Sequence, residues 1–270
     1  MARVPLLLRP RWIVGHVLVV AVAAACISLG LWQLRRLDQR LAYNALVEAR
    51  LAAPPQPLAA LEDQVDVAAP AQAADSAAYR RARVSGRYDT DRELLLRSRA
   101  YQGRAGYHVL TPLVFAPGRA ILIDRGWVPY EMNEPPVLAA APPAGRVTVT
   151  GMLVASQHEP ASRLAPKDPA TGPLDAVFWV DILRLADQFP YVLEPVYLEL
   201  GKQVPAQAGE LPVPPPPPEL SRGPHMGYAL QWFSFALIAL LGYPIVLRRS
   251  VRKAGERAGL GPQGAGIGRR

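Results

Sequence analysis

The sequence predicts a membrane protein with two transmembrane α-helices that flank an extracytoplasmic, mostly β domain, built as an antiparallel sheet or small barrel. Residues 13–34 and 226–247 are apolar runs without a formal charge. A helix of about 20 such residues crosses the hydrocarbon core of a bilayer. Between the two runs, apolar residues alternate with polar ones, which indicates strands. We therefore expect one folded domain, residues 35–225, tethered to a membrane at both ends.

Short alternating segments predict the strands of this domain. They are residues 83–88, 93–99, 107–115, 120–124, 146–153, 178–182 and 196–200. Hairpin turns are expected at residues 89–91 and 117–118, where Asp, Thr, Pro and Gly gather. Many short strands with few helices favour an antiparallel sheet or a small barrel.

Other segments predict helix or loop. Helical spacing continues past the first apolar run toward Pro54, so the first helix is expected to extend out of the membrane. Residues 54–78 show no periodicity and are expected to form a loop. Residues 183–189 predict a short helix that ends at Pro190.

The net charge of +8 lies at the two ends of the chain. Residues 1–12 carry +3, residues 248–270 carry +6, and the rest carries −1. A nucleic-acid-binding protein would keep its basic patch on the folded domain, so we expect no nucleic-acid partner. Basic flanks stay in the cytoplasm, which places both termini inside and the domain outside. With 27 arginines against 3 lysines and much alanine, a bacterial plasma membrane is the expected location.

The first apolar run has an alternative interpretation as a cleaved signal. Residues 23–25 are alanines, and with Cys26 they loosely resemble a lipoprotein cleavage site. The run continues to Leu34, however, which favours an uncleaved anchor. Because Cys26 is the only cysteine, the outer domain has no disulfide and no Cys-x-x-Cys pair. That excludes a thiol–disulfide exchanger and a thiolate copper chaperone.

Two segments have biased composition. Residues 212–218 form a proline-rich linker whose five consecutive prolines, 214–218, predict an extended spacer of roughly 15 Å. Residues 254–270 are rich in glycine and basic residues, and are expected to be disordered and to contact anionic lipid.

The outer domain shows no catalytic constellation or nucleotide fingerprint, so an enzyme is not expected. The run Asp124-Arg125-Gly126-Trp127 predicts a turn with a neighbouring ion pair, with a partner-docking corner as the alternative. His108 and His158 are too few for a typical metal cage.

The histidines of the membrane segments are more informative. His16 lies near the inner end of the first span and His225 at the outer end of the second. About 25–30 Å of helix rise separates them, so they cannot ligate one iron together. We expect His16 to be a structural polar residue and His225 to be the better candidate for an axial haem ligand. Gln231, inside the second span, is expected to bond to a facing helix.

Aromatic and polar residues surround the expected position of His225. Helical spacing puts Tyr228 and Trp232 near it, and Trp32 and Gln33 occupy the matching end of the first span. A haem ring suits such aromatic faces, while its propionates can meet the nearby arginines Arg35, Arg36 and Arg222. The alternative is an ordinary interfacial belt of Trp and Tyr without haem.

Several motifs together resemble the surfeit locus protein 1 family. They are Leu29-Gly30-Leu31-Trp32-Gln33-Leu34-Arg35-Arg36, Val84-Ser85-Gly86-Arg87-Tyr88, Gly106-Tyr107-His108-Val109-Leu110-Thr111-Pro112-Leu113, Ile123-Asp124-Arg125-Gly126-Trp127-Val128 and Pro224-His225-Met226-Gly227-Tyr228-Ala229-Leu230-Gln231-Trp232-Phe233. They follow the family's order, and Met226 stands where leucine is expected.

The resemblance implies an assembly factor for haem–copper cytochrome c oxidase of the aa3 type. Such a protein helps haem a reach oxidase subunit I and works beside haem A synthase. The family's membrane histidine corresponds to His225, which makes this residue the expected contact of haem iron. Two alternatives remain: a non-haem scaffold that stabilises subunit I, and a membrane-anchored hydrolase, which would need a clustered nucleophile and base.

Overall fold

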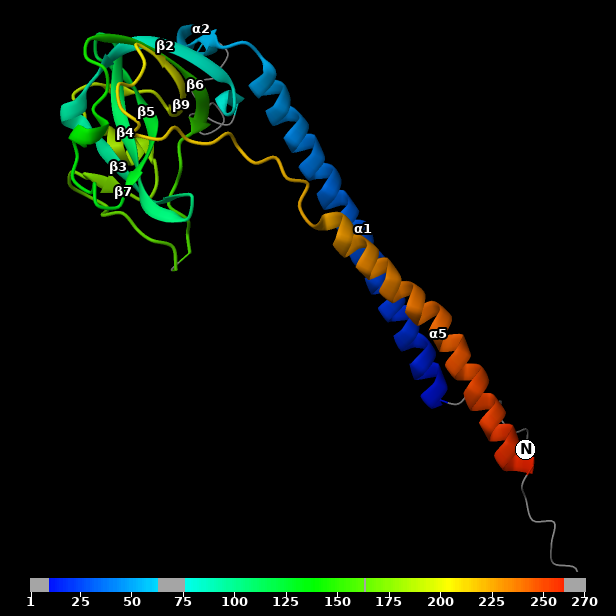
Figure 1. The fold of residues 1–270 in the computed structure, drawn as a ribbon. Coiled ribbons are helices and arrows are strands. Elements are labelled where there is room, and N and C mark those ends of the chain that lie inside the picture. Colours follow the sequence, from blue (N-terminus) through cyan, green and yellow to red (C-terminus); the bar gives the residue numbers. More distant parts are fainter. Residues whose placement is uncertain (1–9, 63–75, 163, 260–270) are drawn as a thin grey trace, which may run out of the picture. The chain divides into compact units, whose positions relative to one another are not determined.

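The computed structural model describes residues 10–62, 76–162 and 164–259. The chain divides into two compact units, a helical unit (Met1–Ala45 with Leu220–Arg270) and a β unit (Leu46–Glu219) (Figure 1). The helical unit thus contains both ends of the chain, and the β unit contains its middle.

The helical unit consists of α1 (Pro10–Ala52) and α5 (His225–Gly259). Within them, Trp12–Ala52 and His225–Lys253 are long and apolar enough to cross a membrane, with mean hydropathies of 2.4 and 1.8. The predicted extension of the first helix is confirmed, since α1 continues to Ala52 and ends just before two prolines. The sidedness of the helices stays a prediction.

The C-terminal segment corrects one expectation. We expected disorder from residue 254, whereas α5 runs on through Gly259. The alanine, lysine and arginine content of residues 250–259 favours helix enough to outweigh two glycines. Residues 260–270 lie outside the described part of the chain.

Small side chains let α1 and α5 pack closely. Gly30 lies so near the Phe233 ring that a Cβ there would stand 2.6 Å from a ring carbon. Ala23, Cys26 and Ala229 are buried, although many large apolar side chains on the same helices are exposed. Close approach through glycine and alanine is how apolar helices associate where no hydrophobic driving force exists between them.

The β unit is a closed five-stranded barrel, the more specific of the two predicted architectures. Its strands, in order around the barrel, are β2 (Arg81–Tyr88), β6 (Arg146–Ala155), β9 (Val196–Val204), β5 (Arg119–Pro129) and β4 (Arg104–Ala116), and β4 pairs with β2 to close the ring (Figure 1). All these pairs are antiparallel except β5–β9. β3 (Leu94–Tyr101) adds to the free side of β4.

Shorter elements complete this unit. They are β1 (Gln56–Pro57), α2 (Leu58–Glu62), η2 (Thr90–Arg92), η3 (Leu138–Ala140), β7 (Ala176–Val177), α4 (Ile182–Ala186) and β8 (Val192–Leu193). One apolar cluster fills the barrel, around Leu113, Ile121 and Leu198. A second packs between the outer face of the sheet and residues 174–193, around Leu122 and Leu185.

Some strand predictions were wrong. Residues 89–91 do not close a hairpin, because β2 pairs with β6 and β4 and not with β3. Residues 178–182 are not a strand; β7 ends at Val177 and α4 begins at Ile182, which confirms the short helix within a few residues. The loop expected at residues 54–78 contains β1 and α2, and residues 63–75 lie outside the described part.

The structure has one hairpin that was predicted and another that was not. Pro117-Gly118 does join antiparallel β4 and β5, with Gly118 at a φ of +69°. A further hairpin joins β3 to β4 through Gln102 and Gly103, both with positive φ. Two consecutive left-handed residues are typical of a tight two-residue hairpin turn.

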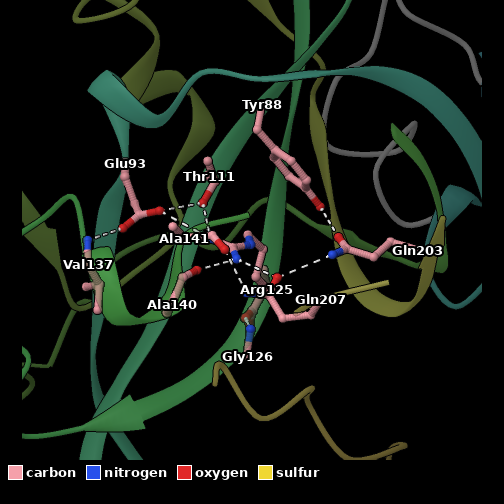
Figure 2. Close-up of polar contacts among 11 residues, drawn as sticks. Tyr88, Glu93, Thr111, Arg125, Gly126, Val137, Ala140, Ala141, Gln203 and Gln207 are labelled. Carbon is pink, nitrogen blue, oxygen red and sulfur yellow. Dashed lines mark hydrogen bonds and ion pairs between the residues drawn. The ribbon is translucent and has the colours of Figure 1, made fainter. Parts of the chain in front are cut away.

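A buried ion pair lies at the end of the barrel interior (Figure 2). Arg125 and Glu93 are both buried, and the Arg125 Nη1 atom lies 3.4 Å from Glu93 Oε2. Thr111 and the backbone N–H of Val137 also donate to the Glu93 carboxylate. Burial raises the pKa of Glu93, and these donors with the arginine oppose that shift.

Arg125 also connects two loops to the barrel through hydrogen bonds. Its other terminal nitrogen donates to the carbonyl of Ala140 and to Gln207 Oε1, while Gln207 Nε2 donates to the carbonyl of Ala141 (Figure 2). The run Asp124–Trp127 therefore lies within β5 rather than in the predicted turn. The expected ion pair of this run is the Arg125–Glu93 pair, which is buried in the β unit.

We predict that removing one charge of this ion pair lowers the free energy of unfolding more than removing both charges. Glu93→Leu leaves a buried guanidinium without its counter-ion and should cost about 3–5 kcal/mol of unfolding free energy. The double variant Glu93→Leu/Arg125→Met should recover most of that loss. Urea denaturation of the three proteins measures the difference, and a double variant less stable than the single one would contradict this assignment.

Candidate functional site

His225 is the first residue of α5, and the chain before it is shaped to expose its ring. Pro224 precedes it, and the amide of Tyr228 donates to the Pro224 carbonyl at 3.2 Å, which opens the helix. Gly223 has a φ of +68°, a backbone conformation that other residues adopt at a cost. The helix start thus fixes the direction in which the imidazole leaves the backbone.

A hydrogen bond across the helix pair holds the imidazole. The Nδ1 atom of His225 lies 2.9 Å from Oε1 of Gln33, a residue only 9% exposed on α1. An amide oxygen accepts and cannot donate, so Nδ1 carries the proton in this contact. In a neutral imidazole the proton then leaves Nε2 with a free lone pair.

The Nε2 edge of the ring is kept open by glycine. A Cβ at position 223 would stand 3.4 Å from Nε2 and 3.3 Å from Cδ2 of His225. The imidazole is partly exposed. Held at Nδ1 and open at Nε2, this side chain has the arrangement of a metal-ligating histidine whose second nitrogen is fixed by a partner.

The aromatic residues predicted for this site lie on the two helices with partly open faces. Trp32 is 48% and Tyr228 is 49% exposed, and the Trp232 ring meets Phe235 edge-on at 5.9 Å between centroids. Among the described residues, none of these three rings stacks on the His225 imidazole. The structure therefore joins Gln33 to His225, while the contact of Trp32, Tyr228 and Trp232 with a ligand stays a prediction.

The other membrane histidine also bonds across the helix pair. The Tyr243 hydroxyl lies 2.8 Å from Nδ1 of His16, with the rings edge-on. Gly15 makes room for this tyrosine, since a Cβ there would stand 3.1 Å from its hydroxyl. His16 is thus a polar interhelical contact, as its structural interpretation requires. Gln231, by contrast, is exposed, and the glutamine that bonds to the facing helix is Gln33.

Comparison with known proteins gives the family. The model of the SURF1 family, the surfeit locus protein 1 family, matches residues 20–237. The chain belongs to the SURF1 family. It is 32% identical to an uncharacterised SURF1-like protein of Mycobacterium tuberculosis over 97% of this chain and 93% of that protein. SURF1-like proteins of Monosiga brevicollis (27%, covering 89% of each chain) and Rickettsia felis (24%, covering 87% and 97%) are also similar.

The SURF1 match includes both parts of the helix-pair site. It begins within α1 before Trp32 and Gln33, and it ends within α5 after His225, Tyr228 and Trp232. The family is one of assembly factors rather than an enzyme class. The SURF1 family is commonly linked to oxidase assembly.

A second polar cluster lies on the outer face of the SURF1 barrel. His108 Nδ1 lies 2.8 Å from Asp124 Oδ2, and Asp124 stands opposite Glu199 in the β5–β9 register. Sequence spacing gave no sign of this cluster, because its members come from three strands. Burial, together with the charge of Asp124, raises the pKa of Glu199 to about 7, against the opposing effect of His108 and Arg99.

This cluster lacks the parts of a hydrolase or a metal centre. Within the described residues no serine, threonine or cysteine is hydrogen-bonded to His108, so the predicted requirement for a nucleophile is not met. The second histidine, His158, lies 3.4 Å from Asp181 on the surface. No group of three His, Cys, Asp or Glu side chains in the described ranges has metal-binding geometry.

We predict that Glu199 makes the stability of the protein depend on pH. Its folded pKa is raised, so the stability that its protonation gives is complete below about pH 4.5 and is lost as the pH rises through about 7. Glu199→Gln should therefore stabilise the protein at pH 8, by up to about 3 kcal/mol, and change little at pH 4.5. Denaturant unfolding at the two pH values measures this, and equal effects at both would contradict it.

Proposed function

We propose that this SURF1-family protein assists the insertion of haem a into subunit I of an aa3-type cytochrome c oxidase, with haem a as a transient cargo. It acts in a bacterial plasma membrane, beside haem A synthase, with its barrel on the outer side. The observation that carries the proposal is the Gln33–His225 hydrogen bond, which presents Nε2 of a histidine at the end of an apolar helix pair.

His225 contributes the iron contact in this proposal. Neutral imidazole is a common axial ligand of haem iron, and it binds through the nitrogen that carries no proton. Gln33 accepts from the other nitrogen, so it fixes both the tautomer and the direction of the ring. Second-sphere partners of this kind typically change metal affinity by about 10–100-fold when removed.

The surroundings suit the rest of a haem. Trp32, Tyr228 and Trp232 offer apolar ring faces on the same two helices, two of them about half exposed. Arg35, Arg36 and Arg222 are exposed beyond the apolar segments, where guanidinium groups can pair with propionates. An open site with one protein ligand also favours release, which a delivery protein needs.

A scaffold without haem is the second candidate function, and one observation favours it. The Gln33–His225 contact has a counterpart in the Tyr243–His16 contact, and both join α1 to α5. Two interhelical hydrogen bonds would stabilise a helix pair that binds and protects oxidase subunit I, and this role requires no haem. The two functions differ in whether the purified protein holds haem.

The absorption spectrum of the detergent-purified protein, co-expressed with haem A synthase, distinguishes these functions. The proposal predicts a haem a band in the wild type, its loss in His225→Ala, and retention lowered about 10–100-fold in Gln33→Leu. His16→Ala is the matched control, because it removes the other interhelical histidine and should keep the band.

The possible absorption spectra support different functions. A colourless wild type that co-purifies with oxidase subunit I supports the scaffold and overturns haem delivery. A band that survives in His225→Ala assigns the iron contact to another residue. Equal losses in His225→Ala and His16→Ala would show that the helix pair, and not the His225 ligand, is what haem requires.

A further inference from the structure

One face of the barrel carries an unusual concentration of positive charge. Three adjacent strands, β2, β6 and β9, place five cations on their outer side, here called the basic face: Arg81, Arg83, Arg87, Arg146 and Lys202. Burial alternates along β2, with Ala82, Val84 and Tyr88 inside. All five cations are at least partly exposed. The β unit as a whole has 16 basic and 20 acidic residues, a net charge of −4, so this basic face is a local feature.

The strand register brings these cations together. Arg87 stands directly opposite Arg146, and Arg83 and Lys202 flank Thr150 from either side. Neighbouring strands lie about 4.8 Å apart, and alternate residues of a strand about 7 Å apart. The five cations thus form two groups, Arg81 with Arg83 and Lys202, and Arg87 with Arg146, which lie about 13 Å apart along β2, a little more than one Debye length at ordinary ionic strength.

The cations of the basic face are not neutralised within the described structure. In residues 10–62, 76–162 and 164–259, none of the five forms an ion pair with a carboxylate. Arg146 has only a long contact, 3.5 Å, with the Ser85 carbonyl. The acidic member of this face, Glu199, faces Asp124, His108 and Arg99 instead. Like charges directly opposite each other destabilise a sheet, so the arrangement costs the free protein stability.

Hydroxyl groups and a groove adjoin the cations. Ser85 and Thr148 lie between the two pairs of cations, with their hydroxyl oxygens 2.8 Å apart. A groove of about 480 Å³ is lined by Arg81, Lys202 and Glu199 together with Met152, Leu51 and the prolines Pro214–Pro218. Guanidinium, ammonium and hydroxyl donors beside an apolar groove match a ligand that carries both carboxylates and apolar side chains.

We propose that the basic face and its groove bind an acidic, extended segment of a partner protein. Carboxylates of the segment pair with the five cations, and an apolar side chain enters the groove beside Pro214–Pro218. Charge complementarity identifies the occupant as an anion, and the groove identifies it as a polypeptide, because a planar lipid surface has no side chain to insert. This interaction is independent of haem and adds a docking surface to the proposed function.

The test measures binding of a probe peptide to the full-length protein in detergent. The probe is a fluorescein-labelled peptide of eight glutamates with one central leucine, followed by fluorescence anisotropy. Arg83→Gln/Lys202→Gln and Arg87→Gln/Arg146→Gln should each weaken binding about fivefold. Combining all four changes should weaken it about 25-fold if the pairs act independently.

The matched control removes the same charge elsewhere on the β unit. Arg97→Gln/Arg104→Gln alters two exposed cations at the β3–β4 hairpin and should leave binding within twofold. Replacing the central leucine by glutamate in the probe tests the groove and should also weaken binding. Arg146→Gln should keep or raise the melting temperature, because it relieves repulsion from Arg87.

Two results would overturn the proposal. One is a control variant that weakens binding as much as the four changes on the basic face, which would mean non-specific attraction. The other is failure of the probe peptide to bind. If the protein also binds phosphatidylglycerol vesicles through these cations, the basic face is assigned to lipid instead. A loss of melting temperature in Arg146→Gln would show that this arginine is a structural residue.

Discussion

The proposed function of this protein depends on one hydrogen bond between the two long apolar helices, α1 and α5. Gln33 on α1 accepts from His225 on α5, although 192 positions separate them in the chain. That contact requires the helices to approach closely, which Gly30 allows by leaving space for the Phe233 ring. Buried polar contacts in an apolar pair are weak individually, but they fix register. The direction of the Nε2 lone pair is therefore set by helix packing.

The β unit is organised around a different constraint, the burial of Arg125. A guanidinium inside a barrel needs hydrogen-bond partners, and Glu93, the backbone carbonyl of Ala140 and the side chain of Gln207 provide most of them for Arg125. These partners come from loops between strands, so the buried charge orders segments that have no strand pairing. In this way the barrel can carry a patterned outer surface, including the basic face, on a rigid frame.

Much of the fold was predictable because it follows local periodicity. The apolar runs gave both helices, and alternation gave five of the barrel strands within a few residues. Pairing was harder, since β2 joins β6 some 60 residues later instead of its neighbour β3. The hairpin at Gln102-Gly103 was missed because glutamine rarely adopts positive φ. Residues 178–182 alternate like a strand, yet Asp181 caps α4 there.

The candidate site residues could likewise be predicted from local sequence, whereas the contacts between them could not. Position at the outer end of the second span made His225 the haem-ligand candidate, and the family resemblance supported that choice. Position along the spans also placed Gln33, Trp32, Tyr228 and Trp232 at matching ends. The pairing of Gln33 with His225 was not predictable, because it depends on how two distant helices pack. The His108–Asp124 pair, and the identity of Glu93 as the partner in the expected ion pair of Arg125, could not be predicted for the same reason. Strand register, which no short pattern encodes, brings His108 near Asp124 and places Arg87 opposite Arg146, whereas Glu93 precedes β3 and reaches Arg125 from outside the strands.

The most direct measurement is pulsed electron paramagnetic resonance of the purified protein loaded with ferric haem a, with ¹⁵N in all its histidines. We predict a hyperfine coupling from a histidine nitrogen bound to the iron, lost in His225→Ala and kept in His16→Ala. Haem that remains bound without any ¹⁵N coupling, or with a coupling that persists in His225→Ala, would contradict it.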